Sequence, residues 1–313
     1  MNPPPAKLAD LHGLDDFALT PAPASVAGDF VELTKARLNF MVLITTLIGF
    51  VIAATRYADV AIDWTLLLNT LIGTGMCAAG SGVLNQAWER DLDRKMTRTA
   101  DRPVAAGRIS VFEATQLGLL LAVCGTATLA ITVNWMAAVL AAATVVLYVL
   151  VYTPLKRITT LNTLVGAIPG AVPPLVGYAA AARTLDLEAA GLFAILFAWQ
   201  MPHFLAIAIM CRDDYAAAGF KMLPVVDPTL TRTSAWMVLW SLVLILASLI
   251  PVYTQPDTGL FYIVSALALG TAFLATCVRC AALRTRPAAR VAFFGSIIYL
   301  PLALGALMID RLL

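Results

Sequence analysis

Nine long apolar runs separated by short polar segments make up most of this 313-residue chain. An α-helix needs about 20 apolar residues to cross the hydrocarbon core of a membrane, so each run is long enough, or nearly so, to span it. The pattern therefore predicts an all-α integral membrane protein with nine transmembrane helices. The runs are residues 38–55, 64–87, 112–133, 135–153, 161–182, 188–210, 234–254, 259–280 and 290–309.

The fifth run is interrupted by the sequence GAIPGAVPPLVGY at residues 166–178. Prolines and glycines in such close succession disfavour a regular helix. Irregular backbone at membrane depth is tolerated only where it is buried in protein or lines a cavity. We therefore expect this segment to border a pocket.

Positive charge is distributed unevenly between the two sides of the predicted bundle. With the N-terminus placed in the cytoplasm, all but three of the 21 Lys and Arg residues fall on cytoplasmic segments, the exceptions being Arg56, Arg183 and Arg311. Cytoplasmic segments of membrane proteins carry the excess of such cations. The distribution thus predicts a cytoplasmic N-terminus and a C-terminus on the outside. The clusters of polar residues also lie on the cytoplasmic side, whereas a transporter usually shows them near mid-membrane.

The composition agrees with a membrane protein, because 60% of the residues are hydrophobic and only 13% are charged. Soluble domains carry about 25% charged residues. The five cysteines lie within or at the end of apolar runs, so we expect no disulfide framework. Cys277 and Cys280 form a lone CxxC without a second pair, which disfavours a metal or redox site there. We expect membrane lipid around the chain and no nucleic-acid partner.

Residues 1–30 differ from the rest of the chain. They contain Pro, Ala and acidic residues, a single Lys and no apolar stretch, which fits neither a secretory signal nor an Arg-rich transit peptide. We expect a disordered cytoplasmic tail, followed by a single transmembrane domain over residues 31–313. The membrane that this predicts is a bacterial cell inner membrane.

Residues 85–103, NQAWERDLDRKMTRTADRP, form the most highly charged stretch of the chain. If the second apolar run stays helical to its end, Asn85, Glu89 and Asp93 share one face. Amide and carboxylate oxygens suit Mg²⁺, which commonly joins carboxylates to substrate phosphates. The alternative is a charged cytoplasmic loop that only sets topology. Asp91 lies about 200° around the helix from Glu89, on another face, so it is a secondary candidate for the site.

The cations of the same stretch could bind a diphosphate directly, since Arg makes forked contacts with phosphate. Arg98 and Arg102 are the first candidates, and Arg94 is a secondary one. Lys156 and Arg157 lie in another cytoplasmic loop. Taken alone, these two cations are interpreted as positive-inside anchors. If they lie beside an acidic metal site, we expect them to bind phosphate.

Residues 199–224 contain a histidine inside an apolar run and two carboxylates where that run ends. An ionisable residue at membrane depth is a candidate functional residue, so we treat His203 as one; the alternative is a buried, satisfied histidine. Asp213, Asp214 and Lys221 are secondary candidates.

The three stretches together resemble the UbiA-type intramembrane prenyltransferases and, within them, the haem O synthases, or protoheme IX farnesyltransferases. The resemblance covers residues 30–310. The first stretch carries the Asn-x3-Asp-x3-Asp pattern that is shared across the superfamily. Two others, YTPLKRITTLNTLVGAIPGAVPPLVGY and WQMPHFLAIAIMCRDDYAAAGFKMLPVV, are similar to sequences specific to haem O synthases.

This resemblance implies nine helices around a central pocket that opens to the cytoplasm. It implies a Mg²⁺-dependent enzyme that transfers the farnesyl group of farnesyl diphosphate to a vinyl group of haem b, with addition of water, to give haem O. Haem b is then a substrate rather than a cofactor. The product would serve terminal oxidase biogenesis, with haem A synthase or the oxidase as possible protein partners.

Carried onto this chain, the resemblance assigns Asn85, Glu89 and Asp93 to the metal and to catalysis. It places Arg98, Arg102, Lys156 and Arg157 at the diphosphate.

Two departures from the superfamily pattern stand out. Glu89 replaces an Asp of the first acidic motif, and His203 stands where the second acidic motif begins. The sequence therefore does not decide whether a second Mg²⁺ site exists. It also leaves three roles for His203, namely iron ligand, orienting group or participant in the water step. Two other functions stay as alternatives, namely a UbiA-type enzyme with an aromatic acceptor and a non-catalytic haem carrier.

Overall fold

The computed structural model describes residues 25–57, 62–254 and 259–311, and these segments are helical with short connections. Nine of the described helical segments are long and apolar enough to cross a membrane. Each coincides with one predicted apolar run, so the all-α prediction with nine spans is confirmed for this part of the chain. The spans are Ala36–Arg56, Trp64–Asp93, Val111–Thr132, Trp135–Ile158, Asn162–Ala182, Leu187–Met210, Thr231–Thr254, Leu260–Leu283 and Arg286–Asp310.

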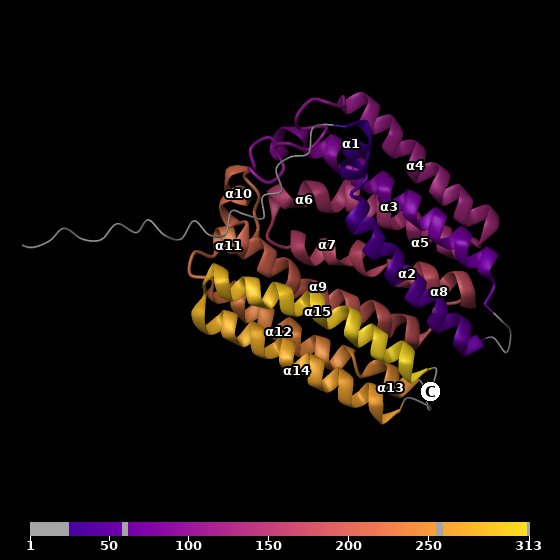
Figure 1. Cartoon of the computed structure of the whole chain (residues 1–313). Coiled ribbons are helices and arrows are strands. Elements are labelled where there is room, and N and C mark those ends of the chain that lie inside the picture. Colours follow the sequence, from indigo (N-terminus) through magenta and orange to yellow (C-terminus); the bar gives the residue numbers. More distant parts are fainter. Residues whose placement is uncertain (1–24, 58–61, 255–258, 312–313) are drawn as a thin grey trace, which may run out of the picture.

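The spans are built from consecutive helices that Figure 1 labels in chain order. Short helices α1, α10 and α11 accompany them at one end of the molecule. The elements are α1 (Val26–Leu33), α2 (Ala36–Tyr57), α3 (Trp64–Asp93), α4 (Val111–Thr132), α5 (Trp135–Val146), the π-helical turn η2 (Leu147–Tyr152), α6 (Thr153–Ile158), α7 (Asn162–Ala171), α8 (Pro173–Ala182), α9 (Leu187–Met210), α10 (Arg212–Ala217), α11 (Leu223–Val226), α12 (Thr231–Ala247), α13 (Ile250–Thr254), α14 (Leu260–Leu283) and α15 (Arg286–Asp310).

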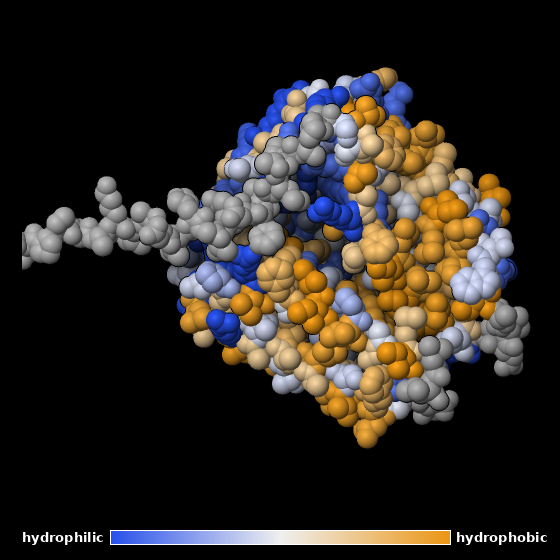
Figure 2. Space-filling model, in the orientation of Figure 1, coloured by the Kyte–Doolittle hydropathy of each residue, from blue (hydrophilic) through white to orange (hydrophobic). Residues whose placement is uncertain are grey.

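The surface is that of a multi-pass membrane protein. Figure 2 shows apolar residues over most of the visible face, while hydrophilic residues gather around a recess and at the end where α1 and α10 lie. Many large apolar side chains are exposed, among them Phe40, Ile131 and Ile298. Such a continuous apolar surface is stable only against lipid or another apolar partner. The orientation of the bundle in its membrane stays a prediction.

Helix α3 is longer than a membrane is thick. Its 30 residues extend about 45 Å at the usual rise, compared with a hydrocarbon core of about 30 Å. Its last turns therefore project beyond the apolar layer and keep their polar residues in a helical array.

The fifth run forms two helices, α7 and α8, that meet at Val172. The predicted interruption is thus confined to one junction, and no residue of this span is among those that line the polar pocket described below. The expectation that the segment borders a pocket is not confirmed at this cavity, and for a larger substrate pocket it stays a prediction. Its small residues instead allow close helix packing: a Cβ on Gly177 would lie 1.9 Å from the carbonyl oxygen of Thr46 in α2, and one on Gly49 would lie 2.0 Å from that of Pro174.

The N-terminal boundary of the helical part lies earlier than we predicted. Helix α1 begins at Val26, and the side chain of Ser25 caps it by accepting a hydrogen bond from the backbone of Gly28. The predicted tail over residues 1–24 lies outside the described residues. The division into tail and single domain stays a prediction.

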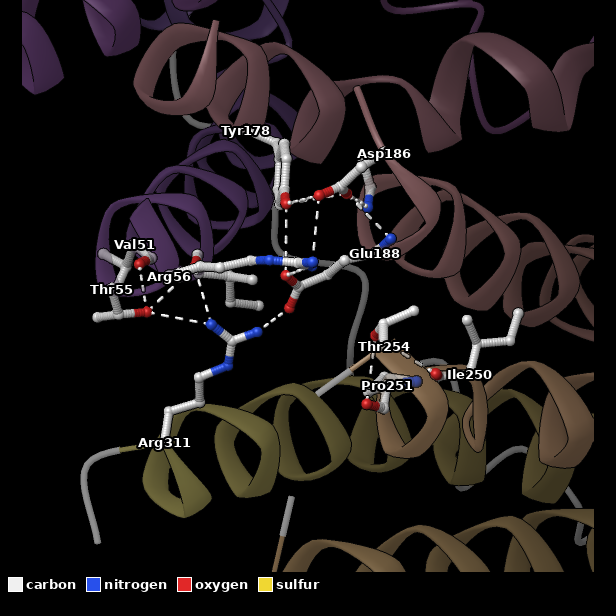
Figure 3. Close-up of polar contacts among 12 residues, drawn as sticks. Val51, Thr55, Arg56, Tyr178, Asp186, Glu188, Ile250, Pro251, Thr254 and Arg311 are labelled. Atoms are coloured by element: carbon white, nitrogen blue, oxygen red, sulfur yellow. Dashed lines mark hydrogen bonds and ion pairs between the residues drawn. The ribbon is translucent and has the colours of Figure 1, made fainter. Parts of the chain in front are cut away.

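A polar cluster joins the first and last spans at the end of the molecule opposite α10 (Figure 3). Arg56 of α2 donates to Glu188 Oε2 at 2.7 Å, and Arg311, just after α15, pairs with the same carboxylate. Arg311 also donates to the backbone carbonyl of Ile52 at 2.9 Å. Asp186 accepts from the Tyr178 hydroxyl at 2.9 Å and caps α9. We call Arg56, Tyr178, Asp186, Glu188 and Arg311 the closing cluster, because it fastens α2 to α15.

Candidate functional site

The projecting end of α3 places Asn85, Glu89 and Asp93 on one buried face. Each is at most 2% exposed. Spacing of four residues aligns them along the helix, and the Asn85 amide donates to Glu89 Oε2 at 2.9 Å. The face that the sequence predicts is therefore present, and it points into protein rather than into solvent.

Three cations meet this face, one for each of its residues. Lys156 Nζ lies 2.8 Å from Glu89 Oε1 and 2.9 Å from Oε2. Arg102 donates to both oxygens of Asp93, at 3.0 and 2.9 Å. Lys35 Nζ donates to Asn85 Oδ1 at 2.7 Å. The carboxylates and cations thus form one buried network that joins α3 to the segments before α2 and after η2.

A cavity of about 120 Å³ opens at this network. A water molecule occupies about 30 Å³ in the liquid, so the cavity holds a group the size of a few waters, such as a diphosphate. It is too small for a haem or a farnesyl chain, since sites for drug-sized ligands start at about 300 Å³. The lining residues are Lys35, Asn85, Glu89, Asp93, Met96, Arg98, Arg102, Tyr148, Tyr152, Lys156, Tyr215, Phe220 and Met222.

The lining has a surplus of positive charge. It contains four Lys or Arg residues and two carboxylates, so two cationic charges stay uncompensated within it. Burying unpaired cations costs free energy, and an anionic ligand removes that cost. A phosphate or diphosphate group therefore suits this cavity better than a neutral ligand.

Lys35 lines the cavity, although nothing in the sequence pattern singles it out. It precedes the first apolar run, where a cation reads as a positive-inside anchor. Its backbone is left-handed, with φ of 51°, a conformation that is uncommon for a non-glycine residue. Its hydrogen-bond partners are neutral groups, the Asn85 amide oxygen at 2.7 Å and the Tyr148 hydroxyl at 3.4 Å. Burial lowers the pKa of Lys35, because no carboxylate neutralises it directly.

Aromatic rings form the other wall of the cavity. Tyr148 and Tyr152 come from the π-helical turn η2, a local distortion that often marks functional sites. Lys156 Nζ lies 4.8 Å from the ring centre of Tyr152 and 5.6 Å from that of Phe220, within cation–π range. Arg98 lies 5.9 Å from the ring of Tyr215. These rings offer a surface that tolerates a nearby cation, which the sequence could only suggest.

The structure brings some of the predicted site residues to the cavity and leaves others outside it. Asn85, Glu89, Asp93, Arg98, Arg102 and Lys156 line it. The other seven candidates are not among its lining residues, and these are Asp91, Arg94, Arg157, His203, Asp213, Asp214 and Lys221.

Four of these seven candidates lie in polar surroundings near the ends of the helices. Asp91 is exposed and pairs with Arg94 at 3.6 Å. Arg94 also donates to the carbonyl of Ala105 at 2.6 Å, so it ties the loop that follows α3. The side chains of Arg157 and Lys221 are exposed.

Asp213 and Asp214 lie at the rim, on α10. Asp213 forms an exposed ion pair with Arg286 at 2.5 Å. Asp214 accepts from the backbone N–H of Thr97 at 3.2 Å, which links α10 to the loop after α3. Neither residue is among those that line the cavity. Their contacts in the structure are with protein groups at the edge of the site.

His203 lies apart from the cavity, on the side of α9 that faces α15. Its ring stacks on Trp199, with ring centres 4.7 Å apart, and on Phe293 at 5.1 Å. Nδ1 lies 2.7 Å from the Ser296 hydroxyl. The chain therefore keeps its intramembrane histidine in an aromatic setting, away from the network of carboxylates and cations.

The cavity residues fit a divalent cation only in combination with a ligand. Among the described residues, no group of three or more His, Cys, Asp or Glu side chains is placed to hold a metal ion. Glu89 and Asp93 supply two carboxylates, and Asn85 supplies an amide oxygen. Mg²⁺ is usually held by one or two carboxylates together with substrate phosphates. The donor set matches that mode and does not match a cage made of protein groups alone.

Comparison with known proteins identifies the family. Residues 42–298 match the model of the family described as "UbiA prenyltransferase family". A protoheme IX farnesyltransferase of Solibacter usitatus is 44% identical over 288 residues, which cover 90% of this chain and 98% of the relative. One of Rhodopseudomonas palustris is 39% identical and covers 97% of this chain and 96% of the relative.

Solved structures share the fold at low sequence identity. A digeranylgeranylglyceryl phosphate synthase superposes with a TM-score of 0.76 at 16% identity, covering 91% of this chain and 98% of that chain. A UbiA homologue of Archaeoglobus fulgidus, bound to GPP and Mg²⁺, superposes with a TM-score of 0.63 at 14% identity, covering 90% and 99%. The helical architecture is thus the same in all three.

Proposed function

We infer that this chain, which belongs to the UbiA prenyltransferase family, is a membrane enzyme that transfers the farnesyl group of farnesyl diphosphate to a vinyl group of haem b. Addition of water completes the reaction and gives haem O. One observation carries the inference: near-full-length relatives with this activity in their names share 37–44% identity with the chain. The polar cavity adds a site for the diphosphate that such a transfer releases.

The cavity residues provide the means to hold and activate the diphosphate. Lys35, Lys156 and Arg102 already converge there, and they can turn from Asn85, Glu89 and Asp93 to phosphate oxygens. Asn85, Glu89 and Asp93 would hold Mg²⁺, which supplies neutralising charge to the leaving diphosphate when bound. Donors that are fixed before the reaction stabilise charge where it develops and need no rearrangement at that moment.

Transfer begins when the C–O bond of farnesyl diphosphate breaks and its electron pair leaves with the diphosphate. The terminal vinyl carbon of haem b attacks the allylic cation and forms the new C–C bond. Water then adds to the cation left on the carbon next to the porphyrin and releases a proton, which leaves a hydroxyethylfarnesyl group. Tyr152, Tyr215 and Phe220 present ring faces that tolerate the allylic cation and exclude water from it.

The location and the later fate of the product extend this proposal. The uneven distribution of cations supports a cavity that opens to the cytoplasm. The membrane of this proposal is a bacterial cell inner membrane. Haem O would pass to a haem A synthase or directly to a terminal oxidase. An aromatic acceptor is less well supported, because His203 stands where that class of enzyme has its second acidic motif. A haem carrier without activity would leave the cationic cavity unexplained.

The test is conversion of haem b in isolated membranes. Membranes that contain the full chain would be incubated with haem b and farnesyl diphosphate, with Mg²⁺ or with a chelator, and the haems separated by chromatography. We expect haem O with Mg²⁺ and at least a 100-fold loss with chelator or with Asp93→Asn. Membranes that contain the Arg157→Gln variant serve as the control. If haem b stays unchanged while a phenolic acid is farnesylated, the acceptor is wrong.

A further inference from the structure

The imidazole of His203 is held on both faces and at one edge. Trp199 and Phe293 stack on it with interplanar angles of 21° and 28°. The Trp199 indole in turn donates to the backbone carbonyl of Ser296 at 2.7 Å. Two helices, α9 and α15, therefore fix the position and tilt of the ring.

The hydrogen bonds of Ser296 settle which nitrogen of His203 carries the proton. The single hydroxyl hydrogen of Ser296 is donated to the carbonyl of Phe293 at 2.5 Å. The hydroxyl oxygen must then accept from His203, 2.7 Å away, so Nδ1 carries the hydrogen. Nε2 of the neutral ring keeps a free lone pair, and no described residue forms a hydrogen bond with it. Apolar surroundings favour this neutral form.

A neutral imidazole with its other N–H anchored is the usual form of a metal-ligating histidine. His203 lacks the neighbouring carboxylates that a Mg²⁺ site needs, and imidazole suits iron and other transition metals. The reaction inferred above brings one such metal to the protein, inside its acceptor substrate. Haem b also needs a place of its own, because the 120 Å³ cavity at the diphosphate site cannot contain it.

We propose that Nε2 of His203 is an axial ligand of the haem b iron and thereby sets the position of the acceptor substrate. The proposal rests on the proposed function, from which it takes the haem. His203 is a positioning residue, since the iron is not a reacting atom. Because the porphyrin is rigid, holding its iron at His203 restricts where the vinyl carbons can lie in the protein.

The depth of His203 agrees with this role. It lies seven residues before Met210, the last residue of α9, which places it about 10 Å along the helix from the end that leads to the cavity wall. This offset keeps the ligand clear of the charged network.

The test uses the two histidines of the sequence as a matched pair. Purified full-length protein would be titrated with ferric haem b and followed by optical absorption and electron paramagnetic resonance. We expect a histidine-ligated spectrum for the unchanged protein and for His12→Ala. His203→Phe keeps an aromatic ring between Trp199 and Phe293 but removes both nitrogens, so that spectrum should disappear. Free imidazole should restore it in His203→Ala, where a space is left.

Ser296→Ala adds a graded readout. It removes the hydrogen-bond acceptor that orients the imidazole, and loss of such a partner weakens metal binding by about 10-fold to 100-fold. We expect the histidine-ligated spectrum to persist at a correspondingly higher haem concentration. A spectrum that is unchanged in His203→Phe overturns the proposal, as does its loss in His12→Ala alone.

Failure of this proposal can be told apart from failure of the proposed function. If membranes form haem O but His203→Phe binds haem with an unchanged spectrum, the activity stands and the ligand is wrong. If no haem O forms and no haem binds, the proposed function fails together with the ligand.

Discussion

Lys156 Nζ lies within 2.9 Å of both carboxylate oxygens of Glu89, a residue 67 positions earlier in the chain. The neighbouring Arg157 is exposed and outside the cavity. Two adjacent cations of helix α6, where the sequence predicted a loop, thus have different surroundings. This contrast assigns Lys156 to the site and leaves Arg157 with a role in membrane topology.

Replacing Lys156 should impair the reaction far more than replacing Arg157. We expect Lys156→Gln to lower kcat/KM for farnesyl diphosphate by about 10²–10³, the usual loss when one preorganised electrostatic donor is removed. Arg157→Gln should change it less than threefold, since its charge lies in solvent. Haem O formation by purified variants measures both, and equal losses at the two positions would show that only overall charge matters. Lys156→Arg, which retains the charge, should keep more activity than Lys156→Gln.

Arg102 should contribute to stability as well as to binding. Arg102→Leu leaves the buried Asp93 carboxylate without its bidentate partner, and breaking a buried pair in this way costs about 3–5 kcal/mol. The double variant with Asp93→Asn should recover much of that loss, because the uncompensated charge is gone. Arg108→Leu is the control, since its pairs with Asp29 and Asp101 lie nearer to solvent and are worth about 1 kcal/mol at most. Unfolding of the purified protein in detergent measures all three.

Lys35 should make diphosphate affinity depend on pH. Its pKa is lowered in the free protein by burial, and a bound diphosphate would favour the protonated form and raise that pKa. Binding then takes up a proton at pH values between the pKa of Lys35 in the free protein and its higher pKa in the complex. Affinity for farnesyl diphosphate should therefore fall as pH rises through that pKa.

The control for this pH dependence is Lys35→Met, which cannot take up the proton. Calorimetric binding in buffers of different ionisation enthalpy would count the protons directly. The Lys35→Met variant should bind more weakly and keep only the pH dependence of the diphosphate itself. An identical proton uptake in both proteins would exclude Lys35 as its source.

The closing cluster should stabilise the bundle without touching the chemistry. Arg311→Leu removes one of the two arginines that meet the buried Glu188 carboxylate, so we expect a lower unfolding temperature, equivalent to about 1–3 kcal/mol. Arg183→Leu is the matched control, because Arg183 is exposed near the same end of the molecule. Activity per folded molecule should be unchanged in both. A loss of turnover in folded Arg311→Leu would instead link this cluster to the reaction.

Periodicity explains why much of the architecture could be predicted. Apolar runs of membrane length identify the spans, and the spacing of Asn85, Glu89 and Asp93 places them on one face wherever the helix continues. Lys35 could not be chosen from the sequence, because a cation beside an apolar run has the same pattern whether it anchors the helix or enters a cavity. Only the turn between α1 and α2 directs it inward.

Local geometry also explains the other differences. The choice between Lys156 and Arg157 depends on the rotation of the helix after η2, which neighbouring cations do not reveal. Glycines and prolines at residues 166–178 predicted irregular backbone, which the structure confines to the junction at Val172. The small residues there allow close packing against α2, which local sequence does not reveal. The closing cluster brings together residues more than 250 positions apart, since Arg56 and Arg311 meet the same Glu188 carboxylate. No local sequence pattern indicates such a contact.

The closing cluster has a consequence for the order of assembly in the membrane. The first span is inserted early, but its link to the ninth cannot form until the ninth has entered the lipid. During that interval Glu188 has Arg56 as a partner and lacks Arg311, so its charge is only partly compensated. A chain that stalls before its last span would therefore present an incompletely neutralised carboxylate between its first and sixth spans.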